Sequence, residues 1–153
     1  MFKLLNVENK VELALSIEGY QFPGSPTDDW CFVKVVVKQG DNAFEAIDPA
    51  LETTDLLSTL EWFRCLAKRK LPRYSRLCFI EPGLEFEFLA SEDSLVRISI
   101  SLSHELKPNF DLEQFGLSTA EWKVIFELGA TEFEKVISSI EATTLQYTVR
   151  AQN

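Results

Sequence analysis

Carboxylates are the plentiful reactive side chains of this sequence, which has 24 acidic residues and one histidine among 153 residues. Glu85 and Glu87 stand two apart in a segment with strand-like alternation, which puts both on one face about 7 Å apart, and a glycosidase needs such a pair. The apolar residues between them are expected to face the core, so a solvated face is the favoured interpretation. Glu81 and Glu105 would have to converge in a pocket with separated pKa values to act as acid and base, and the sequence gives no sign of that.

Other catalytic and ligand-binding chemistries lack their motifs. His104 has no His-Glu-x-x-His, paired-Cys or calcium-loop pattern beside it, so no metal or cofactor is predicted. The absence of Gly-x-Ser-x-Gly and Gly-x-Gly strings argues against nucleophilic catalysis and nucleotide binding. Three cysteines at wide spacing, Cys31, Cys65 and Cys78, are interpreted as small buried hydrophobes. The sequence therefore predicts a protein that is not an enzyme.

Acidic and aromatic side chains also gather around a loop rich in proline and glycine, residues 22–29. Loop acids beside aromatics suit recognition of a basic protein. The alternative interpretations are Asx turns for the two aspartates of the loop and core packing for the aromatics. Together with the strand glutamates, the candidate partner-binding residues are Tyr20, Asp28, Asp29, Trp30, Glu85 and Glu87.

Composition indicates one acidic globular domain over residues 1–153. The mass is 17.5 kDa, the net charge −9 and the pI about 4.7. No apolar run reaches the ~18 residues of a membrane span, and residues 1–10 lack the apolar core of a secretory signal, so we expect a cytoplasmic protein. The negative charge argues against nucleic acid or an anionic membrane as partner and favours a basic protein. The oligomeric state is not encoded in any of these features.

Hydrophobic periodicity predicts an α+β fold, a mainly antiparallel sheet of about seven strands with two helices packed on it. The strand segments lie within residues 2–20, 30–47, 76–102 and 122–128. The first helix is expected to be capped by Thr53 or Thr54 and to end near residue 70. A Thr131-x-x-Glu134 capping box is expected to open the second helix, which extends to about Leu145.

Several strings in a fixed order resemble a bacterial family. They are GYQFP at 19–23, DDW at 28–30, DP at 48–49, TTDLL at 53–57, LEW at 60–62 and FIEP at 79–82, followed by Leu84 and Phe86. This order is similar to that of immunity proteins of the WapI type, which are encoded beside wall-associated toxins of contact-dependent competition systems. The match extends from residue 11 to about 106, with a weaker strand-plus-helix match to the end.

The resemblance implies a small cytosolic protein that binds a cognate toxin domain and blocks it, without catalysis. Net charge −9 agrees with a basic, nuclease-type toxin, because opposite charge steers association. A non-enzymatic scaffold or small-ligand module, in which a Phe-rich sheet forms an apolar pocket, is the alternative. Twelve phenylalanines support it, although the same rings can fill a core.

Overall fold

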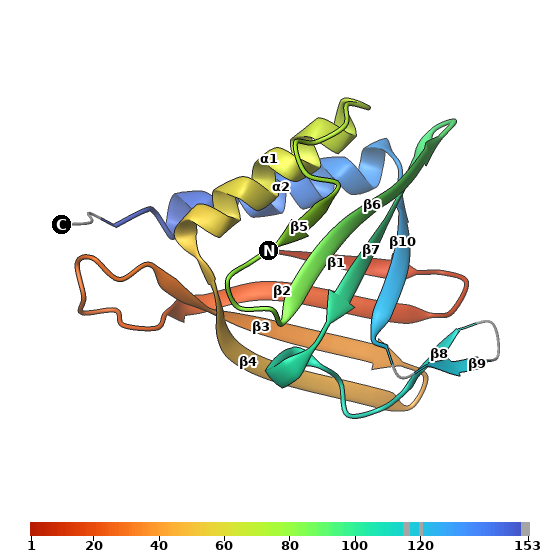
Figure 1. The fold of residues 1–153 in the computed structure, drawn as a ribbon, viewed down its shortest axis with the longest axis horizontal. Helices are drawn as coiled ribbons and strands as arrows, with labels where there is room; N and C mark the ends of the chain where they lie inside the picture. The colour runs from red at the N-terminus through yellow and green to blue at the C-terminus, as the bar shows by residue number, and fades with distance from the viewer. Residues whose placement is uncertain (115–116, 120, 151–153) are drawn as a thin grey trace.

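The computed structural model describes residues 1–114, 117–119 and 121–150, and in this part of the chain two four-stranded antiparallel sheets pack with two helices (Figure 1). Sheet A has the order β1-β2-β3-β4, with β1 (Phe2–Asn6), β2 (Val11–Tyr20), β3 (Trp30–Gln39) and β4 (Asn42–Glu52). Sheet B has the order β10-β7-β6-β5, with β5 (Arg76–Cys78), β6 (Leu84–Glu92), β7 (Leu95–Leu102) and β10 (Lys123–Leu128). The α+β class is confirmed, with eight strands in the two large sheets where about seven were predicted.

Two helices, one 3-10 turn and a short two-stranded sheet accompany the two large sheets in the described residues. The helices are α1 (Thr53–Ala67) and α2 (Ala130–Gln146), a 3-10 turn η1 (His104–Leu106) follows β7, and β8 (Leu112–Gln114) pairs with β9 (Leu117–Thr119). The two helices lie side by side, and Arg64 of α1 forms a 2.9 Å ion pair with Glu141 of α2. None of the described helices has the length and apolarity needed to cross a membrane.

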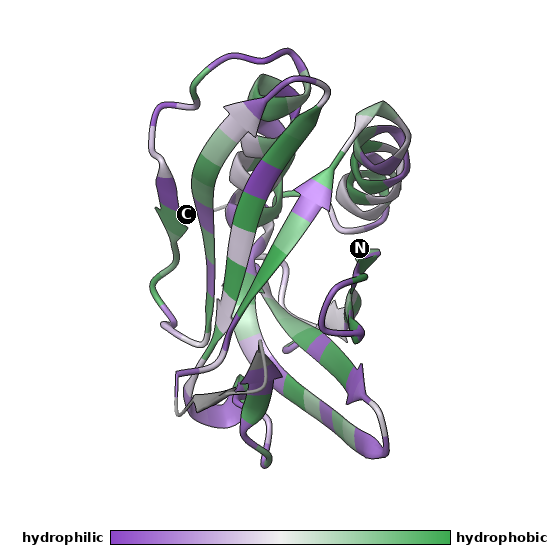
Figure 2. Cartoon of the chain, turned by 90° about the vertical axis from the view of Figure 1, so that its right-hand side faces the viewer, coloured by the Kyte–Doolittle hydropathy of each residue, from purple (hydrophilic) through white to green (hydrophobic). Residues whose placement is uncertain are grey.

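The strands form where the sequence alternates, because alternate side chains point to opposite faces of a sheet. Figure 2 shows this alternation as green and purple bands along the strands. In β3 the buried positions are Cys31, Val33, Val35 and Val37. Each loses its apolar surface to the core, whereas the intervening residues keep contact with solvent.

Both helices begin with a carboxylate that reaches back to the backbone, and neither uses the predicted threonine cap. Glu52 is the N-cap of α1, and its N–H donates to Asp55 Oδ2 at 2.8 Å. Gly129 is the N-cap of α2, and its N–H donates to Glu132 Oε2 at 2.9 Å. Each side chain satisfies one backbone donor that a helix start leaves open. The predicted starts were therefore wrong by one or two residues.

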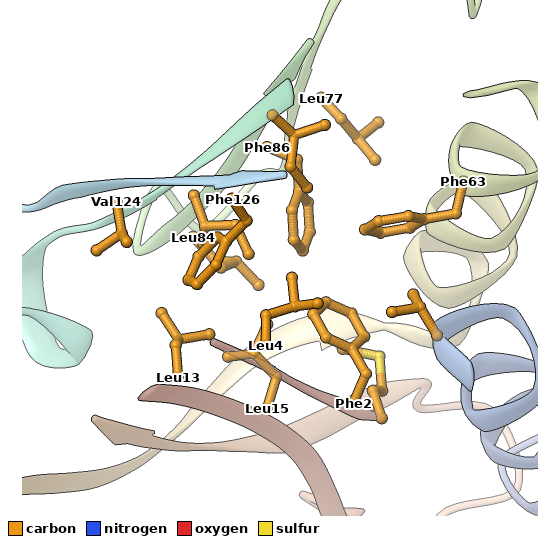
Figure 3. Packing of buried hydrophobic residues seen from close by; sticks show 14 of the residues in the cluster. Phe2, Leu4, Leu13, Leu15, Phe63, Leu77, Leu84, Phe86, Val124 and Phe126 are labelled. Carbon is orange, nitrogen blue, oxygen red and sulfur yellow. The ribbon is translucent and has the colours of Figure 1, made fainter. Parts of the chain in front are cut away.

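One hydrophobic core joins both sheets and both helices (Figure 3). Phe86 of β6 lies at its centre, with its ring centroid 5.7 Å from Phe63 of α1, 5.9 Å from Trp62 and 6.2 Å from Phe2 of β1. Edge-to-face and tilted contacts of this kind add to the free energy gained by burial. These three phenylalanines thus fill the core.

The cysteine interpretation holds for one residue of three. Cys31 is buried in β3, and burial raises the pKa of its thiol to about 11. Cys65 is half-buried, and Cys78 is exposed. The prediction was wrong for Cys78 because β5 is an edge strand of only three residues, in which Leu77 alone is buried.

Candidate partner-binding surfaces

Three predicted contact residues, Asp28, Asp29 and Trp30, lie where the loop of residues 21–29 enters β3. Asp29 is only 3% exposed, and its Oδ1 accepts a 2.7 Å hydrogen bond from the backbone N–H of Arg150. Asp28 Oδ1 accepts a 3.0 Å hydrogen bond from the N–H of Trp30, which is the Asx geometry of a turn. Both carboxylates therefore take part in the local fold.

The guanidinium of Arg150 occupies a cup of backbone carbonyls on the same loop. It donates to the carbonyl oxygens of Phe22 (2.7 Å), Pro23 (3.2 Å), Ser25 and Asp28 (3.1 Å). It also lies 3.4 Å from the ring centroid of Tyr20, whose hydroxyl donates to the Thr148 carbonyl at 2.7 Å. We call this unit the Arg150 clamp. The segment that follows α2 lies beside this loop in Figure 1, so the clamp joins segments about 120 residues apart.

Glu85 and Glu87 lie on the solvent side of sheet B, as predicted, because Phe86 between them turns into the core. Arg76 of β5 bridges both: its Nε is 2.9 Å from Glu85 Oε1, and its Nη2 is 3.3 Å from Glu87 Oε2. Lys123 of β10 approaches Glu87 at 3.8 Å. Both carboxylates are therefore paired with cations in a charged network on this face of sheet B.

The predicted residues therefore belong to two surfaces. Tyr20 and Trp30 end β2 and begin β3 of sheet A, whereas Glu85 and Glu87 belong to β6 of sheet B. The sequence left core packing open for Tyr20 and Trp30 and placed the carboxylates at the surface. It contained no signal for Arg150, because the clamp depends on contacts between segments about 120 residues apart.

A third acidic site was only partly foreseen. The pKa of Asp48 in β4 is raised by burial and by the negative charges of Glu105 and Glu81. Ser103 Oγ donates to the Pro82 carbonyl at 2.7 Å, which ties the segment before β6 to the one that enters η1. Glu81 and Glu105 therefore each lie close enough to Asp48 to act on its charge. Asp48 was missed, although it lies in one of the strings that carry the family resemblance.

No trio of His, Cys, Asp or Glu side chains in the described residues is placed to hold a metal ion. His104 is exposed, with Nδ1 3.0 Å from Ser103 Oγ. Its backbone has a φ of 53°, in the left-handed region that few non-glycine residues adopt. The residue therefore serves the turn into η1 in this structure.

Residues 3–148 match the model of the immunity protein WapI-like family. The chain belongs to this family. The match of the WapI-like chain runs from β1 to the segment just before Arg150, so it includes both sheets and both helices. A search of curated proteins and a search of solved structures each return no match.

Proposed function

We propose that this WapI-like protein binds a cognate secreted bacterial toxin in the cytoplasm and neutralises it by protein–protein contact, without catalysis. The observation that carries the proposal is the family match over residues 3–148. The toxin is proposed to be a basic, nuclease-type domain, because a chain of net charge −9 attracts a cationic partner and a nuclease needs a cationic surface for its polyanionic substrate.

Of the two surfaces described above, we propose sheet B, with Glu85 and Glu87, as the toxin-binding one. The side chains of Tyr20 and Asp29 are already bound to the C-terminal segment, and the Asp28 carboxylate is bound to the Trp30 N–H. The charged groups of sheet B lie on a strand surface backed by the core, which is the rigid support that a binding surface needs.

The test is co-expression with the reading frame next to the gene. That frame is cloned, induced in a host strain and scored for growth with and without this protein. Rescue by the natural chain, with co-purification of the two proteins, is the expected result. The Phe86→Asp variant, which places a charge at the centre of the core, is expected not to rescue. A neighbour that is harmless by itself, or lethal despite the natural chain, contradicts the proposal.

A further inference from the structure

A groove of about 650 Å³ lies between α1 and the segment that leads into and out of β5. Trp62 and Leu77 form a buried apolar floor, while Leu57 and Tyr74 on the rims are 47% and 58% exposed. Trp62 Nε1 donates a 3.0 Å hydrogen bond to the Tyr74 carbonyl, which fixes the distance between the two walls. The groove is therefore a preformed apolar feature, and none of the predicted contact residues lines it.

One wall of the groove is an open strand edge. β5 is the last strand of sheet B, with no further strand beside it in the described part of the chain. Hydrogen-bonded positions alternate along an antiparallel pair. The Phe88 N–H donates to the Ser75 carbonyl at 2.7 Å, so the next bonded position is Leu77. The N–H and C=O groups of Arg76 and Cys78 therefore point away from β6, to the open edge, where they can template another strand.

The charges around the groove define a complementary partner. Four charged residues line it, of which Asp55 caps α1 and Arg76 forms the ion pairs with β6. Glu61 and Arg73 have no ionic partner among the described residues; Glu61 accepts only a 3.5 Å contact from a thiol, and Arg73 stacks over the neighbouring Tyr74. A partner that fits this groove carries a cation opposite Glu61 and a carboxylate opposite Arg73.

We infer that an extended segment of the toxin docks in this groove by adding a strand to the open edge of β5. This inference rests on the proposed function and names its contact surface. Backbone hydrogen bonds to Arg76 and Cys78 hold the segment, and alternate side chains give specificity. One apolar side chain points into the groove over Trp62 and Leu77, and its neighbours meet the ion pairs that Arg76 forms on the outer face of sheet B.

Amide hydrogen exchange of the natural chain, free and in complex with the toxin from the rescue experiment, tests the docking directly. The N–H groups of Arg76 and Cys78 are expected to exchange about tenfold or more slowly in the complex, because they become hydrogen-bonded. Unchanged exchange at both residues in a stable complex overturns the inference. Protection in the free chain that grows with its concentration also overturns it, because a second copy of this chain then occupies the edge.

Matched variants give an independent test. Leu57→Arg on the groove rim is expected to weaken toxin binding by about tenfold or more, because a charged side chain replaces an apolar one that the docked segment would cover. Leu145→Arg on α2, at a residue 81% exposed and outside the groove, is the control and is expected to change Kd less than about twofold. Equal affinities for the two variants contradict the inference.

The edge itself is tested at Cys78. Proline there removes the outward N–H while leaving the bonds of Leu77 to β6, whereas serine keeps the N–H. We expect Cys78→Pro to weaken binding and Cys78→Ser to bind as the natural chain does. If the natural chain rescues growth and all groove variants bind normally, the inference fails and the proposed function stands. If the natural chain forms no complex, both fail.

Discussion

Arg150 connects the C-terminal segment to the 21–29 loop through four carbonyl contacts and the ring of Tyr20. We predict that Arg150→Ala lowers the free energy of unfolding by about 1–3 kcal/mol, because hydrogen bonds from a charged donor and a cation–π contact are lost. Arg150→Lys should recover only part of the lost free energy, because an ammonium group cannot donate to several carbonyls in one plane as a guanidinium does. Urea unfolding measures the change. The control is Lys135→Ala, an exposed α2 residue, for which we expect less than about 0.5 kcal/mol.

Asp48 makes a contribution to the free energy of unfolding that depends on pH. Its pKa is raised by burial and by Glu105 and Glu81, so its charged form is less favourable in the folded chain than in the unfolded one. Asp48→Asn should therefore raise the free energy of unfolding at pH 7, and this gain should disappear at acid pH, where Asp48 is protonated in both states. Urea unfolding at both pH values measures it. A gain of equal size at both pH values contradicts the electrostatic cause.

At the scale of elements, the start of α1 depends on the carboxylate of Asp55, which was expected in the first turn of this helix. We predict that Asp55→Ala lowers the free energy of unfolding by about 1 kcal/mol, because the Glu52 N–H loses its acceptor. Thr53, one of the two predicted caps, has a buried Oγ1 with no hydrogen-bond partner among the described residues. Thr53→Val should therefore be neutral or stabilising. The melting temperatures of both variants, measured by thermal unfolding, test this. A larger loss for Thr53→Val than for Asp55→Ala would show that Thr53 is the cap.

The elements themselves were largely readable from the sequence, because periodicity is a local property. Alternation located β2, β3, β6, β7 and β10, and the α+β class followed from their order. Helix ends were less accurate, since several neighbouring polar residues can satisfy the same backbone groups. The clamp and the open β5 edge were not predictable. They depend on pairings such as Arg150 with Asp29, 121 residues apart, and on which strand ends a sheet.

At the scale of the whole molecule, the core supports the proposed binding surface, and the net charge acts on the approach of the partner. The core joins both sheets and both helices through Phe86, so the β5 edge and the outer face of sheet B are carried on a rigid support. The net charge of −9 supports the proposal of a basic partner. The acidic site of Asp48, Glu81 and Glu105 could not be predicted, because the fold brings its three residues together from separate segments of the chain.

The net charge predicts how the complex with the proposed toxin responds to salt. Raising ionic strength from about 10 mM to about 1 M shortens the screening length from about 30 Å to about 3 Å. We expect the association rate to fall at least about tenfold, while the dissociation rate changes little, because long-range charge acts on encounter. Stopped-flow binding measures both rates.

Two kinds of variant separate encounter from docking in that experiment. Glu81→Lys and Glu105→Lys, at exposed residues outside the groove, should slow association and reduce its salt dependence. Leu57→Arg should instead speed dissociation, because groove contacts form only after encounter. An association rate of the natural chain that is independent of salt would remove electrostatic steering from the proposal and, with it, the argument that the toxin is basic.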